Sequence, residues 1–174
     1  MKAFFLDRDG VINESHHVNR AKDLVLLPGV PEAIRMLGEL GYETFVVTNQ
    51  GGVGLGYMTK RDLERIHRYM KQLIEEGGGK LREIRACIHK PRHGCGCRKP
   101  KPGMLLDLIM RYDIDRTQSF MVGDRDVDIE AGQAASVRAV FIGEKAPAGI
   151  EPDFVYPSLY EAVKELHNQG ILQA

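Results

Sequence analysis

Short apolar runs alternate along the chain with longer segments whose apolar residues recur at helical spacing. The short runs predict strands at residues 2–6, 42–47, 82–88, 118–122 and 137–142. The longer segments predict helices from about 30 to 40, from 59 to 76, from 102 to 112, from 127 to 134 and from 158 onward. This alternation of strand and helix predicts an α/β fold with a mainly parallel sheet.

Turn and capping residues support several of the predicted helix ends. Gly41 follows the first helix as its expected stop, and Thr59 is the expected cap of the second, with Asp62 at the third helical position. Ser158 is the expected cap of the last helix, and Glu161 would complete a capping box.

Composition places the chain among ordinary globular proteins. Its 174 residues fit one domain, and its net charge of zero weighs against a general nucleic-acid or membrane-surface binder. The apolar run at the N-terminus is too short for a signal peptide, and no apolar stretch approaches the roughly 18 residues of a membrane helix. We therefore expect a cytoplasmic, monomeric protein that binds neither nucleic acid nor a membrane.

All three cysteines lie in one stretch, residues 87–101. Cys87, His89, Cys95 and Cys97 form the pattern C-x-H-x5-C-x-C, and three thiolates with one imidazole suit a tetrahedral zinc ion. Four protein ligands leave no open position, which indicates a structural ion. His93 is a second-choice ligand, and a surface loop with scattered thiols is the alternative interpretation.

Polar residues follow several of the predicted strands. Asp7 and Asp9 share one face of an extended segment, so a divalent cation could neutralise them, although an Asp-Gly turn is an equally good explanation. Thr48, Asn49 and Gln50 follow the second strand, and Asp124 follows the fourth. Because ligands bind at the carboxyl ends of parallel strands, we expect a site where these residues converge with Lys99. Residues 11–27 are either a flap over this edge or a solvated loop.

The order of these motifs resembles the haloacid dehalogenase-like phosphatases. The sequence contains D-x-D-G-V, then T-N, then a lysine, then G-D-x-x-x-D, and these motifs span Asp7 to Asp128. The zinc pattern followed by R-K-P-x-P-G-M is similar to the zinc-containing subfamily that acts on heptose bisphosphate or histidinol phosphate. The resemblance implies a three-layer Rossmann-like sheet with helices on both faces, and a single phosphatase domain without a large cap. The flap at 11–27 and the zinc loop at 87–101 would serve instead of a cap.

The resemblance also implies roles for individual residues. Asp7 would be the nucleophile and Asp9 the general acid and base, while Thr48 and Lys99 would contact the transferring phosphoryl group. Asp7, Asp9 and Asp124 would hold a catalytic Mg²⁺ ion. The implied substrate contacts are Ser15, His16, His17, Asn49, Gln50 and Arg98.

The implied reaction is hydrolysis of the 7-phosphate of D-glycero-D-manno-heptose 1,7-bisphosphate through an aspartyl phosphate, within the biosynthesis of nucleotide-activated heptose and lipopolysaccharide. Histidinol phosphate is the alternative substrate. Gly51 and Leu55 stand where serine and arginine are usual in the heptose enzymes, which bears on specificity. A zinc-dependent nucleic-acid-binding module is the alternative from another class, because the zinc loop is basic.

Overall fold

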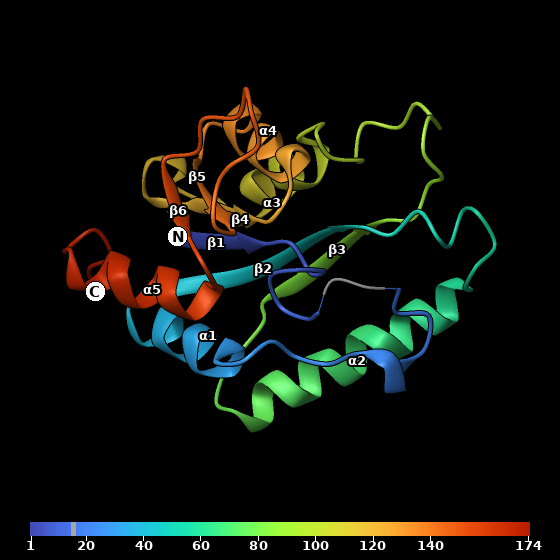
Figure 1. The fold of residues 1–174 in the computed structure, drawn as a ribbon, viewed down its shortest axis with the longest axis horizontal. Helices are drawn as coiled ribbons and strands as arrows, with labels where there is room; N and C mark the ends of the chain where they lie inside the picture. Colours follow the sequence, from blue (N-terminus) through green and yellow to red (C-terminus); the bar gives the residue numbers. More distant parts are fainter. Residues whose placement is uncertain (15–16) are drawn as a thin grey trace.

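A computed structural model describes residues 1–14 and 17–174 and contains one six-stranded parallel sheet (Figure 1). Its strands are β1 (Lys2–Leu6), β2 (Tyr42–Asn49), β3 (Glu83–Cys87), β4 (Phe120–Gly123), β5 (Arg138–Ile142) and β6 (Phe154–Tyr156). They lie in the order β3-β2-β1-β4-β5-β6, and every neighbouring pair is parallel. The predicted α/β class and parallel sheet are confirmed.

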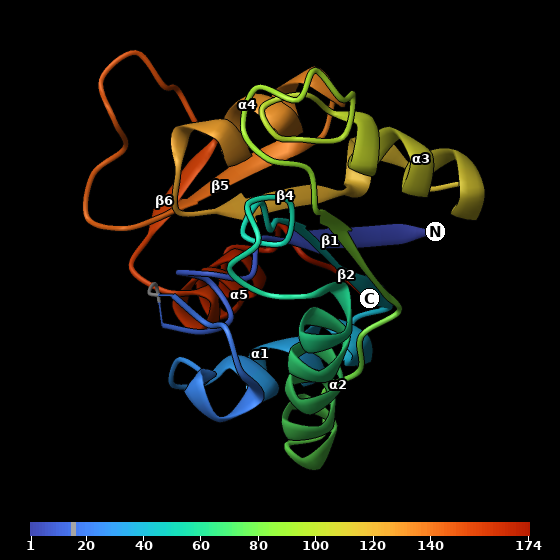
Figure 2. The ribbon, with the colours of Figure 1, turned by 90° about the vertical axis from the view of Figure 1, so that its right-hand side faces the viewer.

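Helices cover both faces of this sheet, which gives the predicted three layers (Figure 2). One face is covered by α1 (Val30–Glu39), α2 (Lys60–Glu76) and α5 (Leu159–Asn168), and the other by α3 (Gly103–Tyr112) and α4 (Asp126–Ala134). Two short 3-10 turns, η1 (Ala21–Asp23) and η2 (Arg116–Gln118), lie in the connections. No cap domain is inserted between the elements of the described chain.

The central strand β1 shows why both faces need a helical cover. Phe4 and Leu6 pack into the core on the side of α1, α2 and α5, whereas Ala3 and Phe5 pack against α3. Side chains alternate across a strand, so an uninterrupted apolar run such as this one is expected only where both faces are buried.

The observed element bounds differ from the predicted ones in a few places. β2 extends to Asn49, so Thr48 and Asn49 are its last two residues, and β4 begins at Phe120 because η2 occupies Arg116–Gln118. Both halves of a capping box form between Thr59 and Asp62. At the last helix the Ser158 hydroxyl accepts from the Glu161 N–H, but the described contacts do not include the reciprocal bond that a complete box needs.

Part of the predicted flap packs onto the core, and its other described residues are half-buried or exposed. Val11, Ile12, Val18 and Leu24 are buried, and Asn13 forms isolated bridges with Asp9 and Leu26. Among the described residues, no helix is both long and apolar enough to cross a bilayer.

Candidate active site

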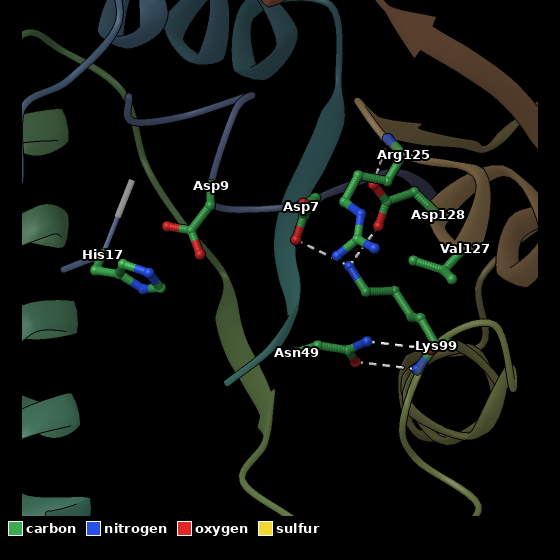
Figure 3. A pocket seen from close by; sticks show the side chains of 8 residues that line it. All are labelled: Asp7, Asp9, His17, Asn49, Lys99, Arg125, Val127 and Asp128. Carbon is green, nitrogen blue, oxygen red and sulfur yellow. Dashed lines mark hydrogen bonds and ion pairs between the residues drawn. The ribbon is translucent and has the colours of Figure 1, made fainter. Parts of the chain in front are cut away.

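The carboxyl ends of the three central strands bring the predicted polar residues to one edge of the sheet. Asp7 directly follows β1, Thr48 and Asn49 end β2, and Asp124 directly follows β4. The Asp7 N–H donates to the Val122 carbonyl oxygen at 3.0 Å, which ties the ends of β1 and β4 together. A hollow of about 340 Å³ opens here (Figure 3), lined by Asp7, Asp9, His17, Asn49, Lys99, Arg125, Val127 and Asp128.

Lys99 is the buried positive charge of this hollow, and Arg125 is a second cation in its lining. Lys99 Nζ donates to Asp7 Oδ1 at 2.9 Å, to Asp128 Oδ1 at 2.7 Å and to the Val47 carbonyl oxygen at 2.7 Å, so all three ammonium protons are used. Burial alone would lower the pKa of Lys99, but the two carboxylates outweigh burial and raise it. The side chain therefore stays cationic although it is almost fully buried.

Negative charge exceeds positive charge around Lys99. Asp7, Asp124 and Asp128 offer carboxylate oxygens that all lie within 4.8 Å of one another. Burial, with help from neighbouring carboxylates, raises the pKa of Asp7 to about 7 against the opposing effect of Lys99. Burial and Asp128 raise the pKa of Asp124 to about 6.

Asp124 Oδ1 is buried without a hydrogen-bond partner in the described part of the chain. Lys99 and Arg125 together cannot balance the three carboxylates of Asp7, Asp124 and Asp128. A hard divalent cation with oxygen ligands would satisfy both the charge and the orphaned oxygen. The residues present therefore fit Mg²⁺.

Gly10 is required for the close approach of Asp124 to the turn after β1. Its φ of +88° lies in the left-handed region, and a Cβ at this position would collide with the Asp124 carboxylate. A glycine at position 10 therefore leaves room for the Asp124 carboxylate, so that it can lie beside Asp7 and Asp128.

Gln50 connects two of the predicted catalytic residues. Its Nε2 donates to Asp9 Oδ2 at 3.1 Å and to Thr48 Oγ1 at 2.9 Å. Because Thr48 Oγ1 is the acceptor in this bond, the hydroxyl proton remains able to donate to a bound anion.

Asn49 uses its amide to hold the backbone of Lys99. Asn49 Nδ2 donates to the Lys99 carbonyl oxygen at 3.1 Å, and the Lys99 N–H donates to Asn49 Oδ1 at 3.0 Å. This reciprocal pair fixes the end of the zinc loop to the end of β2. Asn49 also lines the hollow, but its polar atoms have protein partners there.

A second hollow of about 470 Å³ adjoins the first and shares Asp9, His17 and Asn49 with it. Its remaining lining residues are Arg8, Val18, Asn19, Gln50, Gly51, Gly52, Tyr57 and Met58. His17 is exposed and lines both hollows, and Figure 3 shows it on the Asp9 side of the first one. Ser15 and His16, also predicted to contact substrate, lie outside the described residues.

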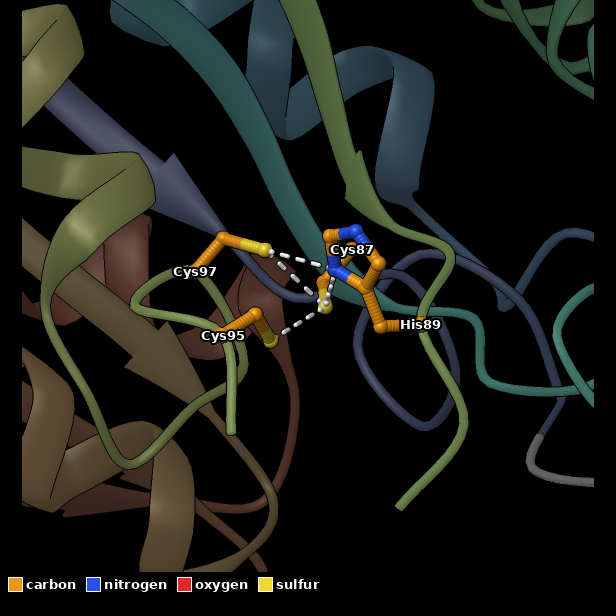
Figure 4. A group of neighbouring side chains, drawn as sticks. All are labelled: Cys87, His89, Cys95 and Cys97. Carbon is orange, nitrogen blue, oxygen red and sulfur yellow. Dashed lines mark hydrogen bonds between the residues drawn. The ribbon is translucent and has the colours of Figure 1, made fainter. Parts of the chain in front are cut away.

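The four predicted zinc ligands come together between the end of β3 and the start of α3 (Figure 4). Cys87 Sγ lies 3.6 Å from Cys95 Sγ and 3.1 Å from Cys97 Sγ, and His89 Nδ1 lies 3.5 Å from Cys87 Sγ and 3.2 Å from Cys97 Sγ. Zn–S bonds of about 2.3 Å in a tetrahedron place sulfur atoms about 3.8 Å apart. The cluster is therefore consistent with structural zinc. His93 stacks on His89 with ring centroids 4.6 Å apart and is not a member of the cluster.

Arg98, like Thr48 and Asp124, lines neither of the first two hollows. It lines a third hollow on the zinc loop together with Arg92, Cys95 and Lys101. A Cβ added at Gly51 would lie 3.2 Å from Arg98 Nη1, so the guanidinium stands just behind the wall of the second hollow.

Two charged residues that line the first hollow, Arg125 and Asp128, were absent from the predicted site. Asp128 is the last residue of the G-D-x-x-x-D motif, so the motif itself could have revealed it. Arg125 had no comparable signal in the sequence.

Comparisons with known proteins agree with this geometry. Residues 96–162 match the family model of HAD-hydrolase-like proteins. The D-glycero-beta-D-manno-heptose-1,7-bisphosphate 7-phosphatase of Rhodopseudomonas palustris is 41% identical over 143 residues, which are 78% of this chain and 79% of the relative. The D-glycero-alpha-D-manno-heptose-1,7-bisphosphate 7-phosphatase of Burkholderia mallei is 39% identical over 144 residues, covering 78% and 76%.

A solved structure extends the likeness to nearly the whole chain. The D,D-heptose 1.7-bisphosphate phosphatase from B. bronchiseptica, complexed with magnesium and phosphate, superposes with a TM-score of 0.88 at 31% identity and covers 97% of this chain and 99% of its own. The chain belongs to the haloacid dehalogenase-like hydrolases and, within them, to the family of D-glycero-D-manno-heptose 1,7-bisphosphate 7-phosphatases.

Proposed function

We propose that the chain is a magnesium-dependent phosphatase that hydrolyses the 7-phosphate of D-glycero-D-manno-heptose 1,7-bisphosphate. The observation that carries the proposal is the group Asp7, Asp124 and Asp128 around Lys99, which leaves a net negative site at the carboxyl edge of the sheet. The names of the relatives support the substrate.

The first half of the reaction transfers the phosphoryl group to the protein. A carboxylate oxygen of Asp7 attacks phosphorus in line, and the bond between phosphorus and the sugar oxygen breaks. Asp9, in its protonated form, gives its proton to that leaving oxygen. The products of this half are a sugar with a free 7-hydroxyl group, an aspartyl phosphate at Asp7 and an ionised Asp9.

The second half returns the protein to its starting state. Asp9 takes a proton from a water molecule whose oxygen attacks phosphorus, and the bond between phosphorus and Asp7 breaks. Inorganic phosphate leaves, Asp7 is again a carboxylate, and Asp9 is again protonated. One residue therefore acts first as acid and then as base, which splits the hydrolysis into two easier steps.

Other residues at this edge of the sheet orient and neutralise the phosphoryl group. Thr48 donates its hydroxyl proton to a phosphoryl oxygen, and Lys99 provides positive charge, exchanging one of its three present acceptors for that group. Asp7, Asp124 and the backbone carbonyl of Asp9 would hold Mg²⁺, which supplies charge neutralisation when bound. Asp128 keeps Lys99 in place.

The sugar extends into the second hollow beside Asp9, where His17 and Gln50 are polar neighbours. Arg98 remains a proposed substrate contact, because its guanidinium lies directly behind Gly51 in the wall of that hollow. We infer further that the protein acts as a cytoplasmic monomer, and light scattering after size-exclusion chromatography tests its oligomeric state.

A panel of phosphate esters tests the proposed function. Phosphate release is measured with both anomers of heptose 1,7-bisphosphate, with histidinol phosphate and with an aryl phosphate, with Mg²⁺ and with a chelator. We expect the highest kcat/KM for one heptose anomer and no turnover in the chelator. A higher kcat/KM for histidinol phosphate would assign the alternative substrate, and an inactive panel in Mg²⁺ would refute phosphatase chemistry.

A further inference from the structure

Arg8 is a buried cation between the two predicted catalytic aspartates. Its side chain is 1% exposed, and it is the largest side chain of the described residues to be fully buried. A guanidinium removed from water has to find hydrogen-bond acceptors, because an unpaired buried charge costs several kcal/mol. The partners of Arg8 therefore identify groups that the fold holds in fixed positions.

One partner of Arg8 is the Asp9 carboxylate. Arg8 Nε and Nη2 donate to Asp9 Oδ1 at 3.0 and 2.9 Å, and Asn13 Nδ2 donates to the same oxygen at 2.9 Å. Asp9 Oδ2 accepts one bond, from Gln50. Three donors on Oδ1 fix the rotation of the carboxyl group, so Oδ2 is the oxygen with capacity left to exchange a proton with a ligand.

The other partner of Arg8 is His67, on α2. Arg8 Nη1 lies 3.2 Å from His67 Nε2, and a guanidinium can only donate. Nε2 must then be the acceptor, which requires a neutral ring with its proton on Nδ1. Burial, assisted by the positive charge of Arg8 and opposed by Asp9, lowers the pKa of His67 to about 3, in keeping with a neutral ring.

We propose that His67 is a positioning residue for proton transfer: it holds the buried Arg8, and Arg8 holds Asp9 with Oδ2 turned toward the leaving oxygen of the substrate. This inference rests on the proposed phosphatase function. It connects the longest helix of the protein to the general acid through two hydrogen-bonded steps, although His67 itself does not touch the hollow.

If His67 positions Asp9 for proton transfer, the loss of kcat/KM in His67→Ala should depend on the leaving group. A sugar alkoxide is a poor leaving group and needs the proton of Asp9, whereas p-nitrophenolate departs readily without one. Misplacing a catalytic group by about 1 Å costs on the order of 100-fold, and general acid catalysis contributes about 100-fold or more. His67→Ala should therefore lower kcat/KM for heptose 1,7-bisphosphate by about 10- to 100-fold, but for p-nitrophenyl phosphate by less than about threefold.

The experiment measures kcat/KM, which reports the steps up to phosphoryl transfer, over aryl and alkyl phosphates of increasing leaving-group pKa. In His67→Ala, kcat/KM should fall more steeply with increasing leaving-group pKa than in the wild type. His67→Gln, which keeps an acceptor for Arg8, should restore most of the loss. Arg68→Ala changes the next, exposed residue of α2 and should leave both rates unchanged.

Equal proportional losses for His67→Ala on both substrate classes would overturn the inference and reduce His67 to a structural role. An inactive wild type would instead refute the proposed function.

Nitrogen NMR of His67 in the wild type gives a second test that needs neither a variant nor turnover. We expect a neutral ring protonated on Nδ1 at neutral pH, and a ring that is cationic or protonated on Nε2 would contradict the arrangement.

Discussion

Lys99→Met tests whether the buried ammonium group balances the acidic site. Methionine keeps most of the aliphatic length of lysine but removes the charge and the three bonds to Asp7, Asp128 and the Val47 carbonyl oxygen. Because the side chain is only 1% exposed, water cannot replace these bonds without opening the site. The variant should fold with lower stability and should lose turnover on every phosphate ester.

The structure gives a magnitude for this loss of stability. Removing one partner of a buried ion pair costs about 3–5 kcal/mol, because the other partner remains buried and uncompensated. For a protein of this size about 1 kcal/mol shifts Tm by roughly 2–4 °C, so Tm should fall by roughly 6–20 °C at pH 8.

The loss of stability caused by Lys99→Met should become smaller as the pH falls. Burial already raises the pKa of Asp7 to about 7, so its ionisation destabilises the folded protein progressively as pH rises from about 4 to 7. Without Lys99 the pKa of Asp7 rises further, so ionisation of Asp7 lowers the free energy of unfolding by more. At pH 5.5 Asp7 is neutral in the variant, and the difference from the wild type becomes smaller.

Calorimetry of both zinc-loaded proteins in buffer without Mg²⁺ at pH 5.5 and pH 8 measures this difference. Lys71→Met is the matched control, since Lys71 forms an exposed i,i+4 pair with Glu75 at 4.0 Å. Such a pair contributes about 0.3–0.5 kcal/mol, so the control should change Tm by about 2 °C or less. Similar losses for the two variants, or a loss for Lys99→Met that does not vary with pH, would refute the reasoning.

Three further substitutions test the assigned roles. Asp7→Asn should abolish phosphate release at saturating Mg²⁺ while circular dichroism stays native, because the nucleophilic carboxylate is gone; measurable normal release would remove Asp7 from that role. Asp124→Asn should raise the Mg²⁺ concentration needed for half-maximal activity, because one charged ligand becomes neutral; a Mg²⁺ dependence identical to the wild type would show that Asp124 is no ligand. Cys95→Ser should lower the zinc content from about one per chain and reduce kcat/KM by about 10- to 100-fold, because Lys99 is displaced. Full activity in zinc-depleted Cys95→Ser would show that the zinc loop does not contribute to catalysis.

Local signals in the sequence predicted most of the fold. Strands such as β1 are continuous apolar runs, and α2 begins at a threonine whose capping box the sequence displays, so both can be identified without tertiary information. The edge strand β6 was not predicted, because Phe154–Tyr156 has three residues, none fully buried, and no alternation to detect.

The site was predictable where its residues lie at strand ends and not where they depend on long-range packing. Asp7, Thr48 and Asp124 follow from the rule that parallel strands present their carboxyl ends at one edge. His67 looks in the sequence like any residue on a helix flank, and only the folded chain brings it to Arg8, 59 positions earlier. Arg98 was predicted from the family resemblance, but both it and Lys99 line the hollow on the zinc loop, and only Lys99 reaches the first hollow.

Phosphorus NMR of the reaction with heptose 1,7-bisphosphate in ¹⁸O-labelled water follows both phosphate groups and the oxygen that water supplies. In Mg²⁺ we expect the 7-phosphate signal to disappear while the 1-phosphate signal persists, and the released phosphate to carry ¹⁸O because water attacks phosphorus. Without Mg²⁺ the spectrum should not change. Loss of the 1-phosphate instead, label in the sugar rather than in phosphate, or equal hydrolysis in a chelator would contradict the account.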